Sequence, residues 1–267
     1  RDKINGDDNS RYDGGTELES MNDRIKREKI GEGVFFTAIT DPKFKSNRIS
    51  VNLLLPLEEE TAANRAIVPF VLRLRYKDCP DFTQLNEKLC DLYGAIVDGD
   101  VRKYGAYQII NLSVQSLDDR YSIAGEPLVQ ECADLACGML FDPYLVSEED
   151  VCLERQNLID TIESEFNDKR EYAINKCLSL MFDGSPLAVK KYGTREKAQL
   201  ITAKSATDAY HDILRRAAVE ILFIGCGDPS AAEKVFSARF AKTQRQPVAY
   251  DASLPCVSAK QVRTVRE

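Results

Sequence analysis

Apolar and polar positions alternate along several stretches of the chain and recur at helical spacing along others. Alternation and enrichment in β-branched and aromatic residues predict strands at residues 34–40, 48–55, 95–101, 106–117 and 219–224. An apolar residue at every third or fourth position predicts helices from Thr61 past Val71 and at residues 83–93, 119–140, 147–166, 169–182, 205–215 and 229–240. Pro69 lies inside the first helix, so we expect a kink or a restart there.

The predicted order is β-β-α-α-β-β-α-α-α-α-β-α, with strands joined as hairpins and helices grouped between them. This order predicts an α+β fold, in which an antiparallel or mixed sheet is packed on one side by helices, rather than a regular βαβ fold. Residues 1–29 lack apolar periodicity, and we expect a disordered tail or an added non-native segment there. The domain is then expected at residues 30–241, followed by the polar, irregular residues 242–267.

The composition is that of a globular protein, with 43% hydrophobic and 30% charged residues in a chain of 267. A net charge of −7 argues against nucleic acid as a partner. No stretch of about 20 apolar residues predicts a membrane span. The eight cysteines form no C-x-x-C pair, and the polar first segment resembles no signal peptide. These features predict free thiols in a reducing cytoplasm.

A glycine-containing loop, Gly225-Cys226-Gly227, stands between the last predicted strand and the last predicted helix. A strand, a G-x-G sequence and a helix resemble the phosphate loop of nucleotide-binding or S-adenosylmethionine-binding enzymes. Two residues argue against this interpretation: Ser230 replaces the third glycine, and Pro229 removes one amide from the helix start. We favour an ordinary final strand and helix, and keep the nucleotide or S-adenosylmethionine site as an alternative.

Five short sequences carry a resemblance to a known family over about residues 30–240. They are KFKSNRIS at 43–50, LCDLYGA at 89–95, LFDP at 140–143, ERQNLI at 154–159 and NDKREYA at 167–173. Their order and spacing resemble the N-terminal domain of the insulinase/pitrilysin (inverzincin) peptidase family. The resemblance is greatest to the bacterial branch of insulinase-like proteins associated with elongation factor P modification, and it implies the family's α+β domain.

Active members of that family carry an H-x-x-E-H motif whose two histidines bind zinc and whose glutamate activates the bound water. The resemblance places Ala66 and Phe70 at the histidine positions, Pro69 at the general base and Thr161 at the later glutamate ligand. Alanine and phenylalanine side chains have no lone pair to give a metal. The single histidine, His211, lies far away in the sequence. We therefore expect no catalytic residue, no bound metal and no cofactor.

The resemblance also implies a role, because inactive members of the family pair with active ones and help to bind peptide. We expect a non-catalytic peptidase homologue that partners an active insulinase-like zinc peptidase, or self-associates, and that binds extended peptides. Residues 242–267 are then expected to be a linker toward a second, similar domain. An active zinc metallopeptidase with atypical ligands remains an alternative.

Overall fold

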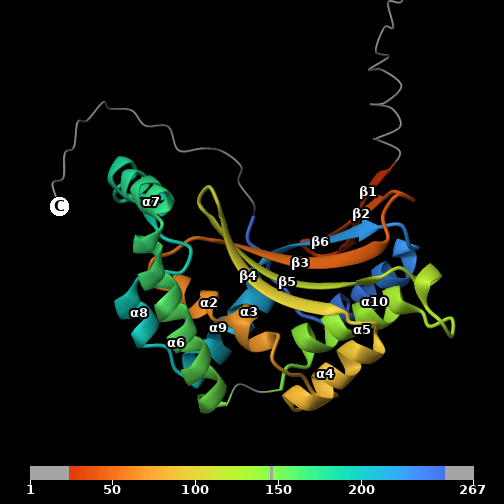
Figure 1. Cartoon of the computed structure of the whole chain (residues 1–267). Coiled ribbons are helices and arrows are strands. Elements are labelled where there is room, and N and C mark those ends of the chain that lie inside the picture. The colour runs from red at the N-terminus through yellow and green to blue at the C-terminus, as the bar shows by residue number, and fades with distance from the viewer. Residues whose placement is uncertain (1–23, 145–146, 250–267) are drawn as a thin grey trace, which may run out of the picture.

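A mixed sheet of six strands forms the centre of the molecule (Figure 1). The computed structural model describes residues 24–144 and 147–249. The strand order is β1-β2-β6-β3-β5-β4, and only the β2–β6 pair is parallel. The strands are β1 Ile25–Gly31, β2 Val34–Thr40, β3 Ser46–Pro56, β4 Ile96–Tyr104, β5 Tyr107–Leu117 and β6 Ala218–Gly225.

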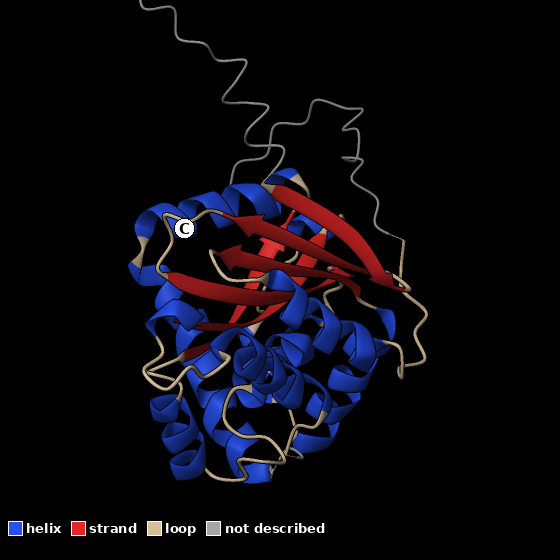
Figure 2. Ribbon diagram, turned by 90° about the vertical axis from the view of Figure 1, so that its right-hand side faces the viewer, coloured by secondary structure: helices blue, strands red, loops and turns tan. Residues whose placement is uncertain are grey.

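Helices cover one face of this sheet, as Figures 1 and 2 show, so the predicted α+β class with one-sided packing is confirmed. Three short 3-10 turns, η1 Asp119–Tyr121, η2 Glu165–Asn167 and η3 Pro186–Ala188, connect the longer elements. The helices are α2 Ala62–Ala66, α3 Val68–Leu72, α4 Phe82–Asp91, α5 Leu128–Phe141, α6 Glu148–Ser164, α7 Lys169–Met181, α8 Arg195–Gln199, α9 Ala203–Arg216 and α10 Pro229–Phe240.

Alternation along the central strands separates a buried apolar face from a polar one. In β3, Ile49, Val51 and Leu53 are at most 1% exposed and belong to the core beneath the helices. The intervening Arg48 and Asn52 lie on the opposite face, because successive side chains of a strand point to opposite sides. The period-two pattern in the sequence therefore decides which face of the sheet the helices cover.

The first strand begins earlier than the sequence predicts. Strand β1 starts at Ile25, inside the tail expected at residues 1–29, and pairs along its length with β2. Its residues are mostly exposed, so they lack the apolar pattern that marks a strand, and backbone pairing with β2 is what places them in the sheet. The expected domain start at residue 30 is therefore wrong. The rest of the predicted tail, residues 1–23, lies outside the described residues.

The beginning of the predicted linker is fixed to the domain. The backbone amides of Gln246 and Val248 donate to the carbonyls of Arg215 and Arg216 at the end of α9. Arg245 is 8% exposed and donates to the Ala217 carbonyl. Residues 242–249 thus pack as a strap against the domain, and residues 250–267 lie outside the described residues.

The helix expected at residues 119–140 is shorter in the structure. Only a 3-10 turn forms at 119–121, and α5 begins after Pro127. Proline blocks the helical conformation of the residue before it, which explains the late start. The expected break near Pro69 is confirmed, because the first helix divides into α2 and α3 at Ile67.

One buried arginine ties α2 to two distant parts of the chain. The guanidinium group of Arg65 is 1% exposed and donates to the Pro56 carbonyl at the end of β3. It also pairs with Glu58 at 3.3 Å and with Asp212 of α9 at 3.1 Å. A buried charge of this kind is stable only when its hydrogen bonds are complete.

We predict that Arg65→Met lowers the free energy of unfolding by about 3 kcal/mol, because it removes a buried cation whose hydrogen bonds connect α2 to the end of β3 and to α9. Urea denaturation followed by circular dichroism measures the change. Arg215→Met is the matched control, since Arg215 pairs with the same Asp212 at 3.5 Å but has a side chain 60% exposed. Its expected effect is below about 0.5 kcal/mol. Equal effects from the two variants would contradict the prediction.

Candidate functional site

Ala66, Pro69 and Phe70, the residues that the resemblance assigns to the zinc motif, lie where two short helices meet. Ala66 is the last residue of α2 and is fully buried, whereas Pro69 is the second residue of α3 and Phe70 the third. Pro69 fits here because the first turn of a helix needs no amide donor. Ile67, which separates the two helices, keeps helical dihedrals of φ −75° and ψ −24°, so the interruption of the helix is local.

Helix α3 rests directly on strand β4. A Cβ atom built on Gly99 would lie 2.5 Å from the carbonyl oxygen of Pro69, so only glycine permits this approach. The contact places the degenerate segment against an edge strand of the sheet, since β4 pairs only with β5. Gly99 was not among the expected site residues, although a lone glycine inside a predicted strand is a known signal of close backbone approach.

Thr161 lies on the exposed side of α6. Its hydroxyl donates to the carbonyl of Asn157 at 2.8 Å, one turn earlier. It lines a cleft of about 460 Å³ whose walls come from β4, α6, α7 and the segment 188–193. Ala66, Pro69 and Phe70 do not line this cleft, although α3 and α6 are in contact.

Carboxylates near Thr161 are engaged with other side chains. Glu163 pairs with Arg195, and Glu165 pairs with Lys190 at 3.0 Å. Glu154, on the buried side of α6, is 4% exposed and accepts from the Asn157 amide at 3.4 Å. Over residues 24–144 and 147–249, no three His, Cys, Asp or Glu side chains are grouped as metal ligands.

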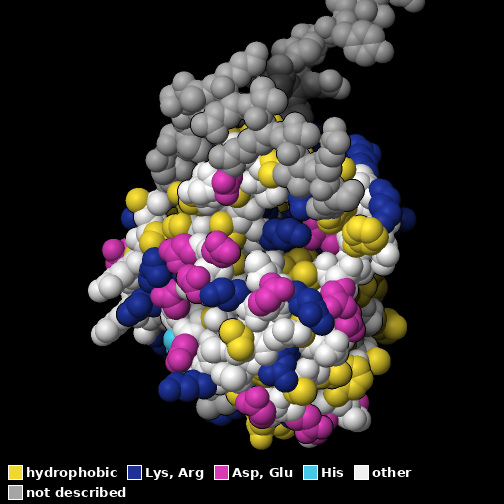
Figure 3. Space-filling view, turned by 90° about the vertical axis from the view of Figure 1, so that its left-hand side faces the viewer, with side chains coloured by type: hydrophobic (Ala, Val, Ile, Leu, Met, Phe, Trp, Pro, Cys, Tyr) yellow, Lys and Arg dark blue, Asp and Glu magenta, His cyan; other side chains and the backbone are white. Residues whose placement is uncertain are grey.

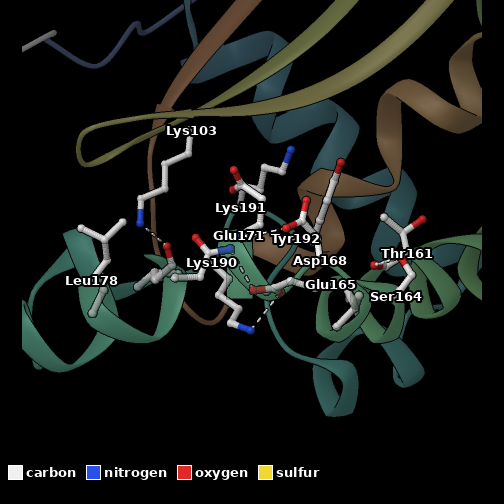
Figure 4. A pocket seen from close by; sticks show the side chains of 15 residues that line it. Lys103, Thr161, Ser164, Glu165, Asp168, Glu171, Leu178, Lys190, Lys191 and Tyr192 are labelled. Atoms are coloured by element: carbon white, nitrogen blue, oxygen red, sulfur yellow. Dashed lines mark hydrogen bonds and ion pairs between the residues drawn. The ribbon is translucent and has the colours of Figure 1, made fainter. Parts of the chain in front are cut away.

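The cleft is lined by charged side chains that are largely satisfied by the protein itself (Figure 4). The ammonium group of Lys103 donates to the carbonyls of Leu187 and Val189, each at 2.7 Å. Burial lowers the pKa of the Lys103 ammonium group below its usual value. Asp168 accepts from the first amides of α7 as its N-cap. The segment that closes the cleft is therefore held to β4 by a lysine from that strand.

Gln108 joins the degenerate segment to the cleft. It is fully buried, and its side-chain amide donates to the carbonyl of Ala62 in α2 at 2.9 Å and to that of Lys191 at 2.6 Å. Gln108 is in phase with Ile110 and Leu112, which are buried on the helix-covered face, so the period-two alternation of β5 was the signal in the sequence for its burial. One side chain of β5 thus sets the spacing between α2 and the cleft wall.

Strand β4 presents unpaired backbone groups along its outer edge. The two-residue turn Gly105-Ala106 closes the hairpin, with Tyr104 opposite Tyr107. In such a hairpin the closing pair exchanges hydrogen bonds and alternate residues turn their backbone outward. The outward set is then Val97, Gly99, Val101 and Lys103. The amide of Val101 is already bonded to the Asp100 carboxylate at 2.7 Å.

The loop Gly225-Cys226-Gly227 is occupied by the protein's own side chains. The amide oxygen of Asn47 accepts the backbone N–H groups of Cys226 and Gly227, each at 3.1 Å. Its nitrogen donates to Asp118 at 3.0 Å. Burial raises the pKa of Asp118, but hydrogen bonds from Asn47 and Arg120 outweigh it and bring the pKa below its usual value. The backbone amides that would bind a phosphate already donate to Asn47, and the anionic carboxylate of Asp118 lies beside them.

We predict that 1 mM S-adenosylmethionine, ATP or NAD leaves the melting temperature unchanged, because Asn47 already fills the loop. A ligand at a hundredfold excess over its dissociation constant would stabilise the fold by about 2.7 kcal/mol. Differential scanning fluorimetry is the measurement, with buffer of matched ionic strength as the control. A rise of several degrees with any one ligand would restore the nucleotide-site alternative.

Comparisons with known proteins were made by sequence and by structure. No protein-family model matches the chain. A probable inactive metalloprotease, YmfF of Bacillus subtilis (strain 168), is 24% identical over 207 residues, which are 76% of this chain and 49% of that protein. The crystal structure of a conserved protein from Enterococcus faecalis V583 is 24% identical, with a TM-score of 0.78, and the match covers 88% of this chain and 57% of that one.

A peptidase M16 inactive domain from Pseudomonas fluorescens superposes with a TM-score of 0.65 at 14% identity, over 87% of this chain and 54% of that one. The chain therefore has the fold of a peptidase M16 domain. The first half of the periplasmic protease PqqL from Escherichia coli shares this M16 fold, with a TM-score of 0.65 at 11% identity over 87% of this chain and 49% of that one. The predicted resemblance to an inactive insulinase-type homologue is confirmed by these M16 neighbours and by the curated relative.

The chain spans about half the length of the proteins that it matches. Among the described helices, none is both long enough and apolar enough to cross a membrane.

Proposed function

We propose that this chain is a non-catalytic insulinase-type homologue that binds extended peptides along strand β4, as the partner of an active zinc peptidase. The observation that carries the proposal is the contact of the broken α2–α3 segment with β4 at Gly99. Through this contact, a segment that lacks metal-binding side chains lies against a strand edge whose backbone groups are free to pair with a peptide. The assignment of Ala66, Pro69, Phe70 and Thr161 to the positions of the family's zinc motif is part of the proposal.

The residue types at the motif support the absence of catalysis. An alanine and a phenylalanine stand at the proposed histidine positions, and a proline at that of the general base. Zinc needs nitrogen, sulfur or oxygen donors, and a peptidase site needs three from the protein. The curated relative is itself described as a probable inactive metalloprotease. Two carboxylates near Thr161 that a zinc site with atypical ligands could recruit, Glu163 and Glu165, now pair with Arg195 and Lys190.

The edge of β4 supports the peptide-binding role. An extended chain added to this edge would gain main-chain hydrogen bonds, and pockets for alternate side chains would supply selectivity. Lys103 lies on β4 and also lines the cleft, so the inward side chains of such a peptide would lie over the cleft. Peptide binding and the cleft therefore belong to one surface.

The proposal also includes a partner protein and a cellular compartment. The proposed partner is an insulinase-type subunit with an intact H-x-x-E-H motif, and affinity capture from the native cell followed by mass spectrometry would test it. Recovery of only non-peptidase proteins would argue against the pairing. We also propose a cytoplasmic setting, which the free state of the seven cysteines in the described residues supports.

We predict that the purified chain, dialysed against 10 µM zinc and then metal-free buffer, retains less than about 0.1 zinc per chain, because its motif has no lone-pair donors. Plasma mass spectrometry gives the ratio, and hydrolysis of a fluorogenic peptide is measured on the same sample. Thermolysin carried through the same dialysis is the control for retained zinc. About one zinc per chain together with hydrolysis would establish the atypical-ligand alternative.

We predict that Val97→Pro weakens peptide binding at least tenfold, because proline removes an outward amide of β4 and its ring obstructs the edge. The probe is fluorescein-labelled, reduced and carboxymethylated lactalbumin, an unfolded polypeptide, and the readout is fluorescence anisotropy. Val97→Thr, which keeps the amide, is the matched control and should bind as the unchanged chain does. Thermal melts of both variants confirm folding. Equal affinities for the two would remove β4 as the binding edge.

A further inference from the structure

Residues 185–192, which we call the flap, border two cavities. One is the cleft of about 460 Å³, whose other walls come from β4, α6 and α7. The second has a volume of about 500 Å³ and is bordered by residues 57–59, just after β3. Ala188, Val189 and Lys190 line both cavities. The flap is therefore a wall next to open space rather than a segment packed into the core.

The flap contributes little to the core of the domain. Among residues 185–192, all of which the structure describes, only Leu187 is buried, and it is 9% exposed. The hydrogen bonds of the turn η3 run from the amide of Ala188 to the Ser185 carbonyl and from the amide of Val189 to the Pro186 carbonyl. Both bonds lie inside the flap, so the flap can move as a unit without breaking them.

A glycine with a positive φ angle flanks the flap at each end. Gly184 has a φ of +76°, and a Cβ atom added to it would meet nothing within 4 Å. Gly193 has a φ of +69° and lies against Ala63 of α2, 3.0 Å from an added Cβ atom. Glycine crosses between positive and negative φ at little steric cost, and hinges are loop residues that absorb such changes. Gly184 is therefore the free hinge of the flap, and Gly193 is the hinge that rests on α2.

Two side chains of the sheet hold the flap closed (Figure 4). The ammonium group of Lys103 donates to the carbonyls of Leu187 and Val189, each at 2.7 Å. The side-chain amide of Gln108 donates to the carbonyl of Lys191 at 2.6 Å. The buried oxygen Oε1 of Gln108 has no partner in the described part of the chain, so this second anchor is incomplete. Lys103 therefore supplies two of the three hydrogen bonds, and we call it the latch.

Ion pairs at the surface add little to the hold on the flap. Lys190 pairs with Glu165 at 3.0 Å, but the lysine side chain is 44% exposed. Helices α7 and α8, to which the flap is joined, lie on the side of the molecule that faces the viewer in Figure 3. Acidic and basic side chains are interspersed there. Exposed pairs are weak, and such a surface has no field of one sign that would fix the flap in place.

We propose that the flap opens away from β4 as a hinged lid, and that its opening joins the cleft and the second cavity into one space. Opening breaks the bonds from Lys103 and Gln108 and exposes Leu187, while the rest of the core stays packed, so it is a local event. The freed ammonium and carbonyl groups gain water, which offsets part of the loss. A lid of this kind sets how large a ligand group the cleft admits. The motion does not depend on whether that ligand is a peptide.

Trypsin measures the opening on the full chain, because the flap contains the adjacent cleavage sites Lys190 and Lys191. Proteolysis of a transiently opened segment tracks the population of its open form. Lys103→Met removes the latch, and we expect it to speed cleavage at these two sites at least tenfold, as quantified by peptide mass spectrometry. Arg102→Met is the matched control, since Arg102 points to the opposite face of β4 and pairs with Asp100. Equal cleavage rates for the two variants overturn the proposal.

A glycine substitution tests the hinge independently of the latch. Gly184→Ala disfavours the closed φ of +76°, so we expect at least a threefold rise in cleavage within the flap. Gly125→Ala is the matched control, because Gly125 has a φ of +81° and equally open surroundings but lies in the loop before α5. Cleavage after Lys88 of α4 reports global unfolding in the same digests. Equal effects of the two glycine variants, or an equal rise at Lys88, overturn the hinged lid.

Discussion

The contact between the Pro69 carbonyl and the bare backbone of Gly99 is the constraint on which the candidate site depends. It lets the α2–α3 segment lie closer to the edge strand than any residue with a side chain would allow. Because Pro69 starts a new short helix, Ala66 is buried at the end of one helix and Phe70 lies on the next. The contact thus places the segment that lacks metal donors against β4.

Polar side chains inside the domain maintain this arrangement over long sequence separations. Arg65 connects α2 to α9, and Gln108 connects α2 to the wall of the cleft. Lys103 holds that wall to the edge strand through two carbonyls. Each of these groups is wholly or partly buried, and each would be costly to leave without its partners. The cleft is therefore shaped by hydrogen bonds from the sheet rather than by apolar packing alone.

The order of strands in the sheet explains why the two ends of the domain depend on each other. Strand β6 enters between β2 and β3, and pairs residues 218–225 with residues 34–40 and with β3. The strap at residues 242–249 then lies beside the Gly33 turn, where a Cβ atom would meet Pro247 at 2.5 Å. Strand β6 joins the first hairpin to the rest of the sheet, so the six-stranded sheet is complete only when this late segment is in place.

The sequence by itself determined the fold class, most element positions and the lack of metal donors at Ala66 and Phe70, because periodicity and side-chain chemistry are local properties. It did not reveal β1, whose exposed residues are held by backbone pairing. It also could not decide the glycine loop, where Asn47 reaches Cys226 and Gly227 across a separation of about 180 residues. Only the tertiary structure brought Gly99 to Pro69 and placed Thr161 in a cleft that Ala66, Pro69 and Phe70 do not line, because such positions depend on how distant elements pack and not on the spacing of residues along the chain.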